Sequence, residues 1–281
     1  MLPFRNEQPE WRYGRKRTPL TMPDTDPDGI VSRLLRCGRP SPEDFLYFCS
    51  IPKLKKRHFD MLLNAGADVH VADAHGKTAL FSAAESGNLV LLRTLLALGL
   101  DPMRRDDAGV IPLSVAVRCG NLSIAQCLLE MTPDPAAVTD AEGSTLLHDA
   151  AWGDMPAIAR RLVDVYGVSP EARDHAGRTP LHVAAYQGSC RMLKFLLEEK
   201  SADINARDRD GRTPLFSGAY DSNLRALKIL CEHDAELSVK DRNGLTALEF
   251  ASGRCEFAAA KFLGKLSGAG DRRAGGNRLR A

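Results

Sequence analysis

Short runs of apolar residues at helical spacing alternate with polar, glycine-containing segments over most of the chain. Within residues 174–207, Leu181, Ala184 and Ala185 recur three and four positions apart, which predicts the buried face of a short helix. After Gly188 the pattern starts again, and a second apolar stripe is formed by Met192, Leu193, Leu196 and Leu197. The pattern therefore predicts pairs of short helices joined by a turn at a glycine.

The residues before the first helix of this pair carry turn and capping signals. Gly177 can adopt the positive φ that a tight turn requires. Thr179 is a typical N-cap residue, and Pro180 at the first helical position has no amide hydrogen to leave unbonded. The helix is therefore predicted to begin at Pro180.

An Asp-x-x-Gly tetrapeptide recurs along the chain at a nearly constant interval. The six copies are Asp73–Gly76, Asp106–Gly109, Asp140–Gly143, Asp174–Gly177, Asp208–Gly211 and Asp241–Gly244. A period of 33 or 34 residues between the glycines predicts stacked supersecondary units in a solenoid. Such a solenoid presents a long concave surface, which favours a binding function over catalysis.

The repeated unit resembles the ankyrin repeat, in which a β-turn is followed by two antiparallel helices and the core reads Thr-Pro-Leu-His-x-Ala. This core is complete at Thr179–Ala184 and recurs in altered form at residues 78–84, 111–116, 145–151, 213–219 and 246–251. The resemblance implies an all-α fold, an ankyrin-repeat solenoid of stacked helix–turn–helix units with β-turn/hairpin connections.

The resemblance also implies a domain organisation. Six full repeats are expected at residues 73–105, 106–139, 140–173, 174–207, 208–240 and 241–266, the last serving as the C-terminal cap. Residues 27–72 lack the turn signature and are expected to form a degenerate N-terminal capping repeat with helices at Pro42–Ser50 and Lys53–Asn64. Residues 1–26 and 267–281 have no apolar periodicity and are expected to be disordered basic arms.

Three of the repeats depart from the pattern. Ile111 replaces the capping Thr, which predicts a helix start weaker by about 1 kcal/mol. Gly153 comes one residue early and Pro156 follows closely, so the turn between those helices must differ. Gly218 stands where Ala is usual, at a helix-propensity cost of about 1 kcal/mol. We therefore expect the fifth and sixth repeats to be looser than the fourth.

Composition narrows the class of protein further. The net charge of +2 conceals two basic ends, +3 in residues 1–20 and +3 in residues 267–281, around a mildly acidic body. No apolar run is long enough to span a membrane, and no secretory leader is expected at the N-terminus. Seven scattered cysteines without a Cys-x-x-Cys pair argue against a disulfide framework or a zinc site. We expect a cytoplasmic or nuclear protein.

The register points to one candidate binding surface. In ankyrin proteins the turn tips and the first helices form the concave binding face, and one of its positions lies seven residues after the capping Thr. Trp152, Tyr186 and Tyr220 occupy that position in three successive repeats, so their rings are expected to form one column. Exposed aromatic residues are typical interface anchors. The alternative is that the three rings only pack on neighbouring turns and stabilise the stack.

The turn tips add charge to this surface. Repeats two and three carry acidic residues there, whereas repeats four to six carry Arg178, Arg209, Arg212 and Arg242. These arginines would orient a partner protein with an acidic segment beside the aromatic column. The alternative is a solvated rim that contributes little binding energy.

Motifs for catalysis are lacking in the sequence. His148 and His182 fall at the His of the repeat core, where a His usually bonds the backbone of its own and the neighbouring turn. No phosphate loop, nucleophile elbow or metal-binding His/Cys pair occurs. We therefore predict no enzymatic activity, no cofactor and no metal.

The leading hypothesis is a monomeric adaptor or scaffold that binds another protein through the concave face and does not bind membranes. The alternative is a nuclear transcription coregulator acting through a DNA-binding partner. It depends on a basic cluster at Arg12, Arg15, Lys16 and Arg17, which could direct nuclear import or could simply be solvated. Pro9, Gly14 and Pro19 interrupt this segment, so direct sequence-specific DNA binding is not expected.

Overall fold

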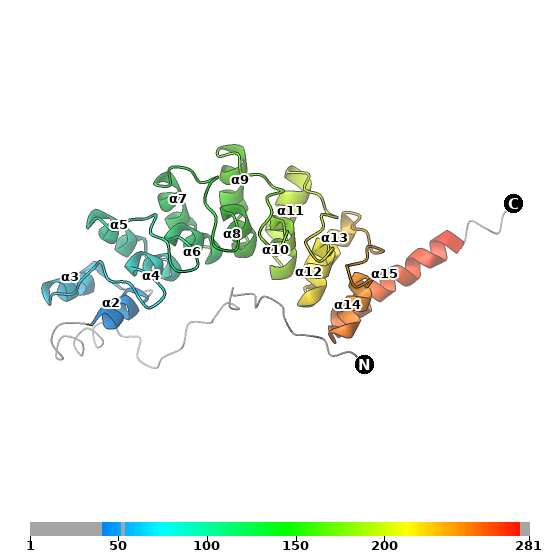
Figure 1. Cartoon of the computed structure of the whole chain (residues 1–281), viewed down its shortest axis with the longest axis horizontal. Helices are drawn as coiled ribbons and strands as arrows, with labels where there is room; N and C mark the ends of the chain where they lie inside the picture. Colours follow the sequence, from blue (N-terminus) through cyan, green and yellow to red (C-terminus); the bar gives the residue numbers. More distant parts are fainter. Residues whose placement is uncertain (1–40, 52–53, 276–281) are drawn as a thin grey trace.

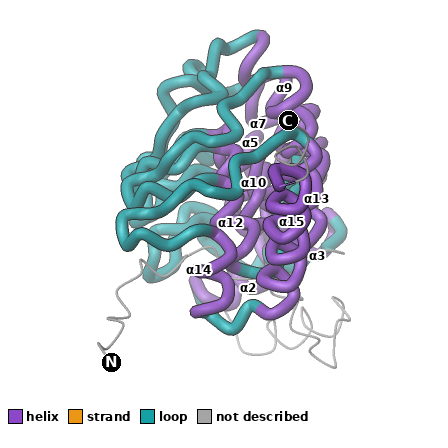
Figure 2. The backbone as a smooth tube through the Cα atoms, turned by 90° about the vertical axis from the view of Figure 1, so that its right-hand side faces the viewer, coloured by secondary structure: helices purple, strands orange, loops and turns teal. Residues whose placement is uncertain are grey.

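The protein is a curved stack of short helices. A computed structural model describes residues 41–51 and 54–275. In this structure, helix pairs follow one another along an arch, with the first helix of each pair on the inner side and the second on the outer side (Figure 1). The hairpin loops gather on one side of the helices (Figure 2). The solenoid predicted from the 33- to 34-residue period and the all-α fold implied by the ankyrin resemblance are confirmed.

Each repeat contributes one inner and one outer helix. The inner helices are α2 (Pro42–Cys49), α4 (Ala79–Ser86), α6 (Pro112–Arg118), α8 (Leu146–Gly153), α10 (Pro180–Gln187), α12 (Pro214–Tyr220) and α14 (Ala247–Gly253). The outer helices are α3 (Lys56–Asn64), α5 (Leu89–Ala97), α7 (Leu122–Glu130), α9 (Pro156–Asp164), α11 (Cys190–Lys194) with its π-helical continuation η1 (Phe195–Glu199), α13 (Leu224–Glu232) and α15 (Phe257–Gly275).

Small residues let the inner helices approach one another closely. Each of them, from α4 to α14, buries at least one alanine completely, and α4, α8 and α10 bury the consecutive pairs Ala83-Ala84, Ala150-Ala151 and Ala184-Ala185. Leucines of the outer helices, among them Leu92, Leu128 and Leu162, close the core from the other side. The core is therefore continuous along the stack, because each repeat covers the apolar face of its neighbour.

The turn between inner and outer helix keeps one backbone conformation even where glycine is missing. Nine residues after the capping position the chain is left-handed in every repeat, at Gly87, Gly120, Asp154, Gly188, Ser222 and Cys255. Asp154 replaces glycine here with a φ of 54° and accepts hydrogen bonds from Met192 N and Arg191 Nε, both at 2.9 Å. These bonds to the next repeat offset the strain of a left-handed non-glycine residue. The altered turn expected near Gly153 is thus formed by Asp154.

The two ends of the stack differ from the sequence expectation. In the capping repeat, α2 and α3 lie within the expected ranges, but α3 begins at Lys56 instead of Lys53. At the other end, α15 continues to Gly275, so the helix extends into residues 267–275, which the sequence assigns to the basic tail. No proline follows Leu266 to stop the helix, and each further turn adds a backbone hydrogen bond.

Candidate functional site

Each turn tip is closed by the aspartate of its Asp-x-x-Gly tetrapeptide. In the fourth repeat, Asp174 Oδ1 accepts from the backbone N–H groups of Ala176 and Arg178 at 3.0 and 2.8 Å, while Gly177 N donates to Asp174 O. The same two side-chain bonds occur at Asp73, Asp106, Asp140, Asp208 and Asp241. Gly177 has a φ of 77°, as the tight turn requires.

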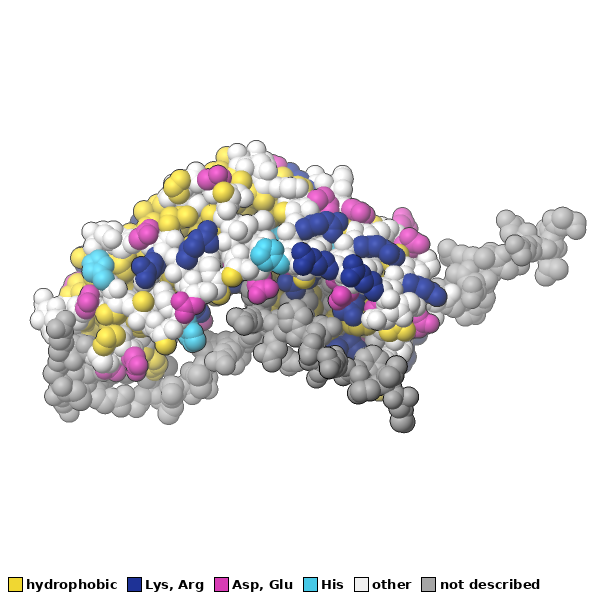
Figure 3. Space-filling model, viewed as in Figure 1, with side chains coloured by type: hydrophobic (Ala, Val, Ile, Leu, Met, Phe, Trp, Pro, Cys, Tyr) yellow, Lys and Arg dark blue, Asp and Glu magenta, His cyan; other side chains and the backbone are white. Residues whose placement is uncertain are grey.

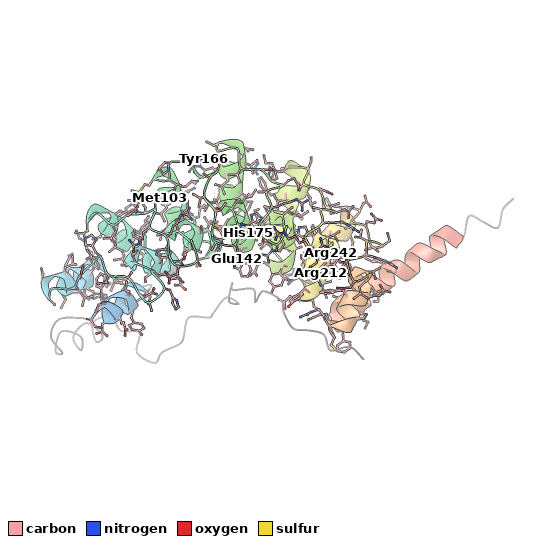
Figure 4. The ribbon with its side chains drawn as sticks, viewed as in Figure 1. Met103, Glu142, Tyr166, His175, Arg212 and Arg242 are labelled. Atoms are coloured by element: carbon pink, nitrogen blue, oxygen red, sulfur yellow. The ribbon has the colours of Figure 1, made fainter. Side chains whose placement is uncertain are left out.

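Neighbouring tips are joined by backbone hydrogen bonds. In each tip after the first, the residue directly after the aspartate donates its backbone N–H to the preceding repeat. The acceptor there is the backbone carbonyl of the residue two positions after that repeat's own aspartate. His175 N donates to Glu142 O at 2.8 Å, and Figure 4 shows these two residues side by side on the tip face. The other members of this tip ladder are Asp107 to His75, Ala141 to Ala108, Arg209 to Ala176 and Arg242 to Asp210, at 2.8–3.0 Å. The tips therefore form one connected surface.

Two buried histidines connect the inner helices to these tips. His182 Nδ1 accepts the backbone N–H of Thr179 at 3.1 Å, so Nε2 carries the proton and donates it to Arg212 O in the next repeat at 3.0 Å. His148 makes the equivalent bonds to Thr145 and Arg178. Burial lowers the pKa of His182 to about 4 and also lowers the pKa of His148. Both residues bond their own and the neighbouring turn, as the sequence predicts.

The three aromatic residues placed by register lie in one column on the inner helices. The ring centroids of Trp152 and Tyr186 are 6.3 Å apart, and those of Tyr186 and Tyr220 are 5.6 Å apart. Trp152 is only 9% exposed, whereas Tyr186 and Tyr220 are half-buried. The predicted column is therefore present, and the two tyrosines are its accessible members.

Two further residues, Phe250 and Arg254, extend this column, and comparison of equivalent repeat positions does not identify them. Phe250 of α14 continues it, with its ring centroid 6.2 Å from that of Tyr220. The Arg254 guanidinium carbon then lies 3.9 Å from the Tyr220 centroid and 5.8 Å from the Phe250 centroid. Phe250 is four residues after the capping Thr246, not seven, and Gly253 holds the seventh position, so matching equivalent positions could not find it.

The four predicted arginines divide into two pairs. Arg178 and Arg212 are largely buried, with side chains 13% and 16% exposed, and form ion pairs with Asp174 and with Asp210 and Asp241. Arg212 also lies over the Phe250 ring, 4.8 Å from its centroid. Arg209 and Arg242 are exposed on the tips. Figure 4 shows Arg212 and Arg242 near each other at the C-terminal end of this face.

The tip face is unequally charged along its length. Lys and Arg side chains gather over the C-terminal repeats in Figure 3. The exposed residues there include Arg173, Arg207, Arg209, Lys240 and Arg242. The repeats before them expose acidic tip residues, Asp73, Asp107 and Glu142, interspersed with Lys77 and Arg105. A basic half and a more acidic half therefore share one surface.

A buried ion cluster lies at the other end of the aromatic column. Arg118 Nη2 lies 3.0 Å from Asp140 Oδ2, and Arg118 Nε donates to Asp149 Oδ1. Arg118, Asp149 and Trp152 line the same small depression. Burial raises the pKa of Asp149, although the Arg118 charge opposes this effect. Two carboxylates thus share one guanidinium beside Trp152.

The described residues contain no cluster of three His, Cys, Asp or Glu side chains that could hold a metal ion. None of the described helices combines the length and apolarity needed to cross a membrane. The predicted nuclear-import residues Arg12, Arg15, Lys16 and Arg17 lie outside the described residues, so their role stays a prediction.

Comparison with known proteins agrees with the fold. A family model for ankyrin repeats, in three copies, matches residues 53–138, 113–208 and 200–270. The chain therefore belongs to the ankyrin-repeat family, whose members generally serve as protein–protein interaction modules. No individual curated protein was found to match the chain.

Proposed function

We propose that this protein is a non-enzymatic adaptor or scaffold that holds a partner protein in the concave face of its ankyrin stack. The observation that carries the proposal is the aromatic column, in which Tyr186 and Tyr220 remain half-buried on the inner helices. A tyrosine ring offers large contact area and loses little conformational freedom on binding, so partly exposed tyrosines are frequent anchors of interfaces.

Charge on the tips suggests the kind of partner. Arg209 and Arg242 are exposed within the basic C-terminal half, and neither forms an ion pair within the described part of the chain. Such side chains attract an acidic segment over several ångströms and orient it before contact. Arg178 and Arg212 support the same site indirectly, because their ion pairs fix the turns that present Arg209 and Arg242.

Replacing Tyr186 and Tyr220 by serine is expected to abolish partner capture. Each anchor contributes about 2 kcal/mol, so the loss of each weakens binding by about 30-fold. The measurement is quantitative affinity capture followed by mass spectrometry. The control is Tyr166→Ser, which removes a tyrosine from the loop after the outer helix α9, at the outer side of the arch in Figure 4. Trp152 is left intact because it is buried, and replacing it would destabilise the fold.

Thermal unfolding of the double variant shows whether the stack survives. Recovery of the same partners in equal amounts by a folded double variant would mean that the column is only structural. Loss of partners by Tyr166→Ser as well would place the binding surface elsewhere.

Reversing the charge of Arg209 and Arg242 to glutamate is expected to slow partner association about tenfold at low salt. Because exposed charges are screened by ions, the difference should shrink as salt is raised to about 0.5 M. Stopped-flow or biosensor kinetics with a captured partner measures both effects. The matched control reverses Arg93 of α5 and Arg225 of α13, two exposed arginines on outer helices. An equal effect of the two double reversals would argue against a role for the tips.

A further inference from the structure

An exposed arginine at the end of the aromatic column is held in place by stacking. Arg254 is the C-cap residue of α14, and its guanidinium lies over the Tyr220 ring at 3.9 Å from the centroid. The same group is 5.8 Å from the Phe250 centroid. A flexible side chain normally loses much conformational freedom when it binds, but contact with two rings has already restricted this one.

The Arg254 charge is not neutralised by the described part of the chain. Its side chain forms no ion pair and no hydrogen bond there, unlike the side chains of Arg178 and Arg212. Two carboxylates belong to the adjoining turns, Asp221 and Glu256, and within the described residues neither forms an ion pair with Arg254. Glu256 instead accepts from Ser222 Oγ at 2.7 Å. The N–H donors of a stacked guanidinium thus remain available beside the column.

A guanidinium in this state matches one kind of ligand. It has donors only, in a planar fork that fits the two oxygens of a carboxylate or phosphate, and stacking leaves the edge of the fork accessible. The opposite end of the column differs, because Arg118 there is shared by Asp140 and Asp149. An anionic group is therefore favoured at the α14 end and disfavoured beside Trp152.

We propose that Arg254 binds an anionic side chain, a carboxylate or a phosphate, of an extended partner segment whose apolar residues contact the aromatic column. This inference rests on the proposed binding function and specifies its ligand and its direction. The anion lies at the α14 end, and the chain runs from there along Tyr220 and Tyr186 toward Trp152.

The ring spacing gives the segment a sequence pattern. Successive rings of the column are 5.6–6.3 Å apart, and an extended chain rises about 3.3 Å per residue. One ring is therefore passed every two residues or so. The segment carries apolar residues at alternate positions and its anionic residue two positions beyond the last of them.

The test uses synthetic eleven-residue peptides and the full chain. Each peptide has two leucines two positions apart, and the residue two positions further is Glu, phosphoserine, Gln or Lys, in both chain directions. Binding is measured by fluorescence anisotropy. We expect at least one anionic peptide, Glu or phosphoserine, to bind about tenfold or more tightly than its Gln counterpart, and the Lys peptide to bind most weakly. Tighter binding of phosphoserine identifies a phosphate as the ligand; equal or tighter binding of Glu identifies a carboxylate.

Arg254→Met is expected to remove the preference for the anionic peptide while leaving binding of the Gln peptide unchanged. Arg254→Lys keeps the charge but loses the fork, and is expected to retain only part of the preference. Arg225→Met, an exposed arginine on α13, is the matched control. Because Arg254 is exposed, the thermal midpoint of each variant should match that of the parent chain.

Two results would overturn the role of Arg254: no difference between anionic and Gln peptides on the parent chain, or an unchanged difference on Arg254→Met. Both are distinguishable from failure of the proposed function, which is tested by partner capture with the Tyr186 and Tyr220 variant. If capture depends on the tyrosines but the anion preference does not depend on Arg254, the concave face binds a partner without this anchor.

Discussion

Replacing Gly153 by alanine is expected to lower the free energy of unfolding by about 3 kcal/mol or more, one of the largest effects of any single methyl group in this chain. An ideal Cβ at this position would lie 2.1 Å from the carbonyl oxygen of Val117 and 3.2 Å from that of Arg118. Both oxygens belong to the backbone of α6, so no side-chain rotation can relieve the overlap. Helices α6 and α8 would have to separate. Urea unfolding followed by circular dichroism measures the loss.

Gly253→Ala is the matched control for this substitution. Gly253 also ends an inner helix, but a Cβ there meets no atom within 4 Å. The alanine is therefore expected to be neutral or to add up to about 1 kcal/mol through helix propensity. Equal effects at the two glycines would show that α6 and α8 are not in the close contact described above.

Acidification from pH 7 to pH 5 is expected to remove about 2 kcal/mol of stability through His182, and more when His148 is included. Burial lowers the folded-state pKa of His182 from 6.5 to about 4. The unfolded chain therefore takes up the proton first as the pH falls below about 6.5. The contribution of this residue is complete above that pH and is lost progressively toward pH 4. Urea unfolding at half-unit pH steps measures the slope.

His182→Gln isolates this contribution. Glutamine keeps an acceptor and a donor but does not titrate, so the variant should be less stable at pH 7 and show a shallower slope between pH 7 and 5. Carboxyl groups also take up protons as the pH falls, so measurements stop at pH 5. Asp149 and Asp208, whose pKa values burial raises, oppose the loss of stability. Glu249, whose pKa is lowered by its hydrogen bonds to Thr246, adds to the loss. A parallel slope in parent and variant would contradict the lowered folded-state pKa of His182.

Much of the fold can be predicted from the sequence because the same residues determine the local structure in every repeat. The aspartate and glycine of each tip, the capping position and the apolar stripes recur at a fixed interval, so a register error in one repeat would be visible in the next. The aromatic column follows from the same register. The register does not predict how exposed each ring of the column is, because exposure depends on the neighbouring side chains. Trp152 is buried, whereas Tyr186 is half-buried.

The parts that were not predicted depend on contacts between different positions of neighbouring repeats. Phe250 and Arg254 reach the column from the fourth and eighth positions after Thr246, which no comparison of equivalent residues can find. Arg178 and Arg212 look like exposed tip residues in the sequence, but the aspartates beside them hold their side chains inward. The Thr213 hydroxyl is a further example. Among the described residues, Thr213 Oγ1 has no hydrogen-bond partner, because Phe216 occupies the position that His182 holds in the fourth repeat.

The tip ladder has a consequence for how such a surface can change. It uses only the N–H of the first residue after each aspartate and the carbonyl of the second, and never their side chains. These two positions already hold residues as different as Asp107, Glu142, His175 and Arg209 on one unchanged backbone. Proline alone is barred from the first position, because it has no N–H to donate. New binding preferences can therefore arise by substitution at the tips while the architecture beneath them stays the same.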